Sequence, residues 1–183
     1  MTEELLVRHC APTLAGLKAG SLFTCAYDSK NEMTRSLRAM NRRLVPKGLR
    51  VLPLRYSGKR ALIYLYRPSR LKKDLAHNLA KTLLEAEGYC SSDCNRCIVR
   101  LADKVRSQQD FPHEIGLFLG YPPEDVSGFI HNKACDHKCV GCWKVYGDPI
   151  QAQKTFDKYN KCTRVYCSKW KGGRTIEQLT VAG

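Results

Sequence analysis

The chain has 183 residues, ten cysteines and a formal net charge of +14 at pH 7. This length fits one domain, or one domain with a small metal-stapled part, and it is long enough for a hydrophobic core. No apolar run predicts a signal peptide or a membrane-spanning helix. Together these features favour a reducing cytoplasm, where clustered cysteines serve metal or redox chemistry more often than disulfides.

The first part of the chain predicts a helix, a strand and a second helix. Residues 3–16 are expected to be helical with an interruption at Pro12, followed by a short strand over 21–27. Ser29 or Asn31 can cap an amphipathic helix that ends near Pro46, with arginines on its polar face.

A β-hairpin is predicted next. Ser57 and Gly58 separate two runs of strand-forming residues, 49–56 and 59–67. Pro53 has no N–H to donate, so the first of these strands should lie at an edge or carry a bulge.

The remainder of the chain predicts mainly helices. Leucine recurs every four residues within 68–88, which predicts one long and regular helix. Further helices are expected from Ile98 toward Gln109, over 111–130 as two short pieces, and from Pro149 to Gly172.

These elements predict an α+β fold, with a small three-stranded antiparallel sheet from residues 21–27, 49–56 and 60–67 covered by about six helices. Residues 1–133 would form the α+β core. Residues 134–183 would form a cysteine-rich helical portion packed on it, within a single domain overall.

Five thiols near the carboxyl end are the first candidate metal ligands. They are Cys135, Cys139, Cys142, Cys162 and Cys167. Short spacers let successive thiolates converge on one ion, so the first three are expected to be ligands and one of the last two the fourth. On an unbroken helix those last two would lie roughly 140° apart, so either the helix breaks or only one of them binds.

The spacing Cys-x3-Cys-x2-Cys also occurs earlier, at Cys90, Cys94 and Cys97, which makes a possible second metal site. Radical S-adenosylmethionine enzymes hold a four-iron cluster at this spacing, but no repeat typical of their barrel is found here. Zinc and iron–sulfur clusters share thiolate ligands, so both remain open as cofactors. Ordinary reduced cysteines or disulfides are the alternative.

A third group of residues suggests a reactive thiol. His9 precedes Cys10 directly, and His113 lies farther along the chain beside Glu114. A catalytic thiol usually has its histidine adjacent in space rather than in sequence, and such pairs are most often structural.

The positive charge is concentrated in one region. Thirteen Lys or Arg and no acidic residue lie between Met33 and Lys73. Anions or a partner would bind the arginines of the helix in this region, which are Arg35, Arg38, Arg42 and Arg43. Such a field attracts nucleic acid or an acidic protein, and a solvated basic surface is the simpler alternative.

Several strings together resemble a known family. They are 9–18, 44–49, 111–126, 139–148 and 161–167. They are similar to a family of small cysteine-containing bacterial proteins, found chiefly in anaerobic Firmicutes and classed as a domain of unknown function. The resemblance covers almost the whole chain and implies a bacterial, cytoplasmic, single-family domain, but it supplies no activity or cofactor.

The sequence therefore predicts a thiolate-ligated zinc or iron–sulfur protein. An iron–sulfur centre would indicate electron transfer with an acidic redox partner docking on the basic surface. A zinc-stabilised nucleic-acid-binding module using residues 33–73 is the first alternative. A thiol-dependent enzyme using Cys10 is the second.

Overall fold

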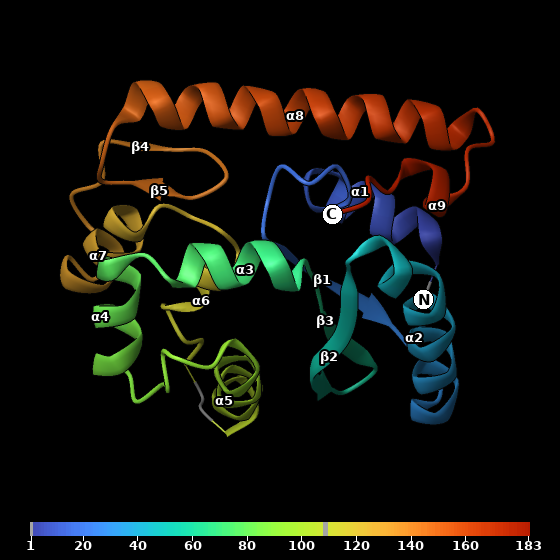
Figure 1. Ribbon diagram of the computed structural model, residues 1–183, viewed down its shortest axis with the longest axis horizontal. Helices are drawn as coiled ribbons and strands as arrows, with labels where there is room; N and C mark the ends of the chain where they lie inside the picture. Colours follow the sequence, from blue (N-terminus) through green and yellow to red (C-terminus); the bar gives the residue numbers. More distant parts are fainter. Residues whose placement is uncertain (1, 108–109) are drawn as a thin grey trace.

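The computed structural model describes residues 2–107 and 110–183, which form an α+β fold (Figure 1). Nine α-helices and two antiparallel sheets lie among these residues. The helices are α1 (Glu3–Leu14), α2 (Lys30–Leu44), α3 (Pro68–Leu75), α4 (Asn78–Ala86), α5 (Cys94–Ser107), α6 (Ile115–Phe118), α7 (Pro123–His131), α8 (Pro149–Lys171) and α9 (Ile176–Leu179). The strands are β1 (Gly20–Ala26), β2 (Arg50–Ser57), β3 (Arg60–Tyr66), β4 (Cys139–Val140) and β5 (Lys144–Val145).

The larger sheet confirms the predicted three strands. Its order is β1-β3-β2 with both pairings antiparallel, so β2 is an edge strand. The register of β2 on β3 shifts between Pro53 and Arg55, which is the bulge expected at a residue without an N–H.

The sheet separates two hydrophobic cores because successive side chains on a strand point to opposite faces. On β3, Ile63 and Leu65 face a core completed by α1, α2 and α9. Tyr64 and Tyr66 face the other core, which α3 to α7 complete. These two tyrosine rings stack at 4.9 Å and are buried, so they pack the core and offer no surface for bases.

Two helix predictions were wrong in detail. α1 continues through Pro12 to Leu14, since a proline in the last turn leaves most of the helix ladder intact. The long helix predicted over 68–88 is two helices, α3 and α4, separated at Ala76 and His77. The break turns α4 toward α7 (Figure 1). Leu83 and Leu84 of α4 are buried in the core that contains Tyr64. The predicted helix end at Gln109 lies outside the described residues.

The C-terminal part completes the N-terminal core. Helix α8 runs along one side of the molecule and packs on α1, and the β4–β5 hairpin lies beneath its first turns (Figure 1). Ile176 and Leu179 of α9 join the core that contains Leu6. No helix in the described part of the chain has the length and hydropathy needed to cross a membrane.

Candidate functional site

The thiols of Cys90, Cys94 and Cys97 lie together at the start of α5. Cys94 opens the helix, and Cys97 follows one turn later, so both lie on the same side of it. Cys90 precedes the helix, and its carbonyl oxygen accepts a hydrogen bond from the Cys97 thiol at 3.2 Å. All three residues of the second predicted metal site therefore lie near the start of α5.

The three thiols differ in exposure and in pKa. Burial, with smaller contributions from Cys94 and Cys90, raises the pKa of Cys97 to about 11. Burial also raises the pKa of Cys94, with Lys72 acting in the opposite direction. Cys90 is exposed, and a hydrogen bond with Ser92 lowers its pKa. Because Cys90 is exposed and Cys97 is buried, this group of thiols is open to solvent on the side of Cys90.

The first predicted set, from Cys135 to Cys167, is spread over the C-terminal part. Cys139 packs against the small cluster that contains Phe156. Cys142 lies near Lys18 instead, and burial raises the pKa of its thiol while Lys18 lowers it. Cys135 is exposed in the loop before β4. As the side chains stand in residues 2–107 and 110–183, no group of three or more His, Cys, Asp or Glu lies close enough to hold a metal, and this holds for Cys90, Cys94 and Cys97 as well as for this set.

Helix α8 is unbroken between Cys162 and Cys167, so these two thiols cannot both bind the same metal through a break in the helix. Cys162 lies about 9 Å farther along the axis than Phe156, and Cys167 about 16 Å, at 1.5 Å per residue. Cys167 packs against the core around α1 instead. The helix therefore carries these two thiols away from the hairpin.

The loop before the hairpin has an unusual backbone. Lys133, Ala134 and Asp136 all have positive φ, at 47°, 66° and 54°. Such conformations are uncommon outside glycine, and three of them within four residues give this loop a constrained backbone. His137, which follows directly, has a buried Nδ1 without a hydrogen-bond partner among the described residues.

Cys10 and His9 point to different sides of α1. Cys10 is fully buried, and burial raises the pKa of its thiol to about 12. His9 is exposed and its ring stacks on Phe23 at 5.8 Å. A buried thiol with so high a pKa is a poor nucleophile, so this geometry offers no support for a thiol enzyme using Cys10.

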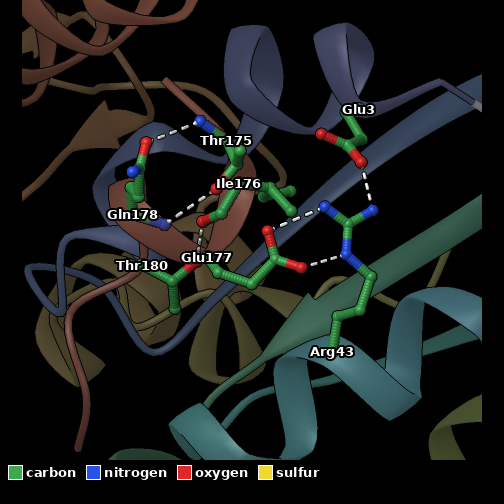
Figure 2. A network of polar contacts seen from close by, with 7 residues as sticks. All are labelled: Glu3, Arg43, Thr175, Ile176, Glu177, Gln178 and Thr180. Carbon is green, nitrogen blue, oxygen red and sulfur yellow. Dashed lines mark hydrogen bonds and ion pairs between the residues drawn. The ribbon is translucent and has the colours of Figure 1, made fainter. Parts of the chain in front are cut away.

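Three of the four predicted arginines face solvent on α2. Arg35, Arg38 and Arg42 line an open groove on the outer surface of the helix. Arg43 instead forms ion pairs with Glu3 and Glu177, as Figure 2 shows. Arg43 is therefore a structural residue that joins α2 to α1 and α9.

A cavity of about 320 Å³ lies between the segment 111–129 and the β4–β5 hairpin. Its walls are mainly aromatic and aliphatic side chains, with Lys144 and His113 among the few polar ones. The sequence pattern did not predict this cavity. The only signal was the density of aromatic residues in the strings 111–126 and 139–148, and nothing in the spacing shows that these strings meet across a cavity.

Comparisons with known proteins give a family and no activity. No curated protein and no solved structure has a significant match to the chain. The model of the family described as "Protein of unknown function (DUF3793)" matches residues 6–180, nearly the whole length. The chain therefore belongs to this family.

Proposed function

We propose that the protein binds a metal ion or an iron–sulfur cluster through Cys90, Cys94 and Cys97. The observation that carries the proposal is that Cys94 and Cys97 lie one turn apart at the start of α5 and that the Cys97 thiol donates to the carbonyl of Cys90 at 3.2 Å. Binding requires the three thiols to move closer together than they stand, since they do not form a group close enough to hold a metal. Thiolates two to four residues apart are a usual ligand pattern for zinc and for iron–sulfur clusters.

The surroundings lower the pKa of the exposed Cys90, whereas burial raises the pKa of Cys94 and of Cys97. The N-terminus of α5 places a partial positive charge next to Cys94, and such a charge stabilises a thiolate. Ser92 and Arg96 lower the pKa of Cys90, and Lys72 opposes the rise that burial causes in the pKa of Cys94. A bound cation would also reverse the effect of burial on Cys97, because a coordinating thiol is deprotonated.

Three protein thiolates leave one position for another ligand. Cys90 faces solvent, so this position would be open to water, to a small molecule or to a partner. An iron–sulfur cluster would supply electron transfer, with an acidic partner docking on the basic surface. A zinc ion would act as a staple between the start of α5 and the loop before it.

The test is purification without oxygen, followed by measurement of bound metals, labile sulfide and the absorption spectrum. We expect about one metal centre per chain, lost in the double variant Cys90→Ser with Cys94→Ser. This variant leaves the buried Cys97 in place, and Cys94, which packs against the core, is replaced by a side chain of the same shape. Zinc without sulfide would exclude the electron-transfer function.

The matched control is Cys135→Ser with Cys142→Ser, two exposed cysteines of the first predicted set. This variant should keep the metal centre. If it loses the metal and the Cys90/Cys94 variant does not, the carboxyl-terminal set is the real site. If wild-type protein purified without oxygen holds neither zinc nor iron, the proposal is wrong.

A second candidate is nucleic-acid binding by α2. It is favoured by the alignment of Arg35, Arg38 and Arg42 along one open groove. Three phosphate contacts would give a slope of about −3 for log K against log salt on duplex DNA. Replacing the three arginines by Gln should abolish that slope in an anisotropy titration.

The control for this candidate is Gln at Lys154, Lys158 and Lys161, three exposed residues of α8. It removes the same charge from another helix, so most of the slope should remain. Equal losses in both triple variants would point to a general effect of net charge, and binding by α2 would be excluded.

A further inference from the structure

We infer that the cavity between the segment 111–129 and the β4–β5 hairpin binds a small planar anion, of the class of aromatic carboxylic acids. The inference is independent of the metal proposal, because none of the lining residues is a cysteine. Its volume of about 320 Å³ is near the lower limit of typical ligand pockets, which hold compact molecules.

The aromatic side chains in the lining favour a planar ligand. Tyr121 and Trp143 stack on each other with ring centroids 4.8 Å apart, and both line the cavity. Trp143 is held in place because its ring also packs edge-on against Phe156 at 4.6 Å and its Nε1 donates to Asp125 at 2.6 Å. Rigid aromatic walls gain binding energy from a flat apolar molecule with little loss of side-chain entropy.

The one acidic residue in the lining is not available to a ligand. Asp125 is 3% exposed. Its carboxylate accepts three hydrogen bonds, from Trp143 Nε1 and from the backbone amides of Tyr146 and Gly147 at 2.7 Å each. The negative charge of Asp125 therefore fixes the hairpin to α7 and does not attract a cation into the cavity.

The remaining charged group in the lining is a cation. The ammonium group of Lys144 donates to the carbonyl of Ala134 at 2.8 Å and lies 5.9 Å from the ring centroid of Phe129. It thus occupies the position that a cationic ligand would take over that ring, and it keeps further protons to donate. Together with the net charge of +14, this makes a carboxylate the favoured polar group.

The mouth of the cavity is unusually apolar for a surface. Phe111 is 38% exposed and Val140 is 61% exposed, and both line the cavity. His113 lies beside them, with its ring edge-on to Phe129 at 5.1 Å. Exposed apolar side chains at the mouth of a cavity can cover the ring of a bound ligand, whose burial would contribute to affinity.

The first experiment is isothermal titration calorimetry with two probes that share one ring system. Indole-3-acetate carries a carboxylate and tryptamine an ammonium group. We expect the acid to bind with a dissociation constant below about 1 mM, and at least tenfold more tightly than the amine. Equal affinity, or preference for the amine, would overturn the charge assignment.

Two variants locate the binding within the molecule. Val140→Trp places a large side chain at the mouth without touching the core and should weaken indole-3-acetate binding at least tenfold. Ile150→Trp is the control, because Ile150 is 67% exposed and lies outside the cavity. Unchanged binding in Val140→Trp would place the ligand elsewhere and refute the inference.

Lys144→Gln removes the charge and should weaken binding of the acid about tenfold, while leaving the weak binding of tryptamine the same or stronger. Lys138→Gln is its control, since Lys138 also bonds a backbone carbonyl of this region, that of Gly147 at 2.7 Å, but does not line the cavity. An equal loss in both variants would mean that total charge, and not the cavity, attracts the acid.

Discussion

Arg43 connects three segments that are distant in sequence. Its guanidinium group bonds Glu3 at the start of α1 and both carboxylate oxygens of Glu177 in α9 (Figure 2). A bidentate pair of this kind fixes geometry as well as charge. Arg43 therefore helps to hold the C-terminal helix on the N-terminal core.

This network predicts a specific pH dependence. Hydrogen bonds from Arg43 lower the pKa of Glu177 to about 2, whereas an unfolded glutamate titrates near about 4.3. A lowered folded-state pKa stabilises the protein above the unfolded value, and this contribution is lost as pH falls toward 2. Both side chains are about one-third exposed, at 37% and 34%, so Glu177→Gln should cost less than about 1 kcal/mol at pH 7.

Urea denaturation from pH 7 to pH 2 checks this expectation. The free energy of unfolding should fall more steeply for wild type than for Glu177→Gln below about pH 5, and the two should converge near pH 2. Glu4→Gln, at an exposed position next to the network, should follow wild type. Parallel profiles for wild type and Glu177→Gln would contradict the role of the pair.

Glu114 belongs to a buried polar network. Its carboxylate accepts hydrogen bonds from Tyr89 at 2.8 Å and from Lys104 at 2.7 Å. Lys104 is 6% exposed and Glu114 is 3% exposed. Glu114→Gln should cost about 3 kcal/mol, because the lysine is left in the core with only Glu87 as an acidic partner.

Guanidinium chloride unfolding measures this cost. Glu87→Gln is the matched control, since Glu87 bonds the same lysine but its side chain is 41% exposed, and it should cost less than about 1 kcal/mol. Adding Lys104→Met to Glu114→Gln should recover part of the loss. An equal loss of unfolding free energy in Glu114→Gln and Glu87→Gln would show that burial of the Glu114–Lys104 pair does not determine its contribution.

Among the elements, the β4–β5 hairpin depends on close contact with α8. A Cβ on Gly141 would lie 2.3 Å from two carbons of the Phe156 ring, so the hairpin approaches the helix at a position where only glycine fits. The same helix begins with a cap in which Asp148 accepts from the amides of Ile150 and Gln151. The hairpin and the first turns of α8 therefore form one packed unit.

Gly141→Ala should destabilise the protein by about 1–3 kcal/mol through overpacking. For a chain of this size the midpoint of thermal unfolding should fall by about 2–10 °C. Gly172→Ala is the control, because a Cβ there meets its nearest atom at 3.4 Å, which is an ordinary contact. Thermal unfolding of the two variants, followed by circular dichroism, measures the two midpoints. Equal midpoints would contradict the close packing of Gly141 on Phe156.

For the molecule as a whole, one sheet with a core on each face joins the N-terminal and C-terminal parts. Leu6 and Leu14 of α1 pack in the same core as Ile176 and Leu179 of α9. Because α8 and α9 cover α1, residues 1–133 alone would expose much of this core to water.

Calorimetry should therefore show one cooperative unfolding transition for the full chain, with equal calorimetric and van't Hoff enthalpies. The fragment 1–133 should not give a cooperative transition under the same conditions. Two separate transitions in the full chain would contradict this expectation and would make residues 134–183 an independent unit.

The strands were predictable because their signals are local. Alternating residues flank Ser57 and Gly58, and Pro53 indicates an edge or a bulge without reference to the rest of the chain. The helix predicted over 68–88 failed because its leucine period continues through Ala76 and His77, where packing of α4 on α7 decides the direction of the chain. Local periodicity cannot report that contact.

The candidate sites illustrate the same difference. The spacing Cys-x3-Cys-x2-Cys occurs twice, yet Cys94 and Cys97 share one helix face, whereas Cys139 and Cys142 lie on a hairpin and have different neighbours. The spacing of two cysteines fixes the relative direction of their side chains only when the local backbone conformation is known. The cavity could not be predicted at all, since its walls come from segments that only the tertiary structure brings together.

The sequence by itself determined the α+β class, the three main strands, the basic surface of α2 and the thiols available as ligands, because each follows from side-chain chemistry and period along a short stretch. The tertiary structure alone decided that Arg43 is paired, that Cys10 is buried and that a cavity lies beside the hairpin. These depend on contacts between residues far apart in the chain, and such contacts are fixed by the packing of whole elements around a shared core.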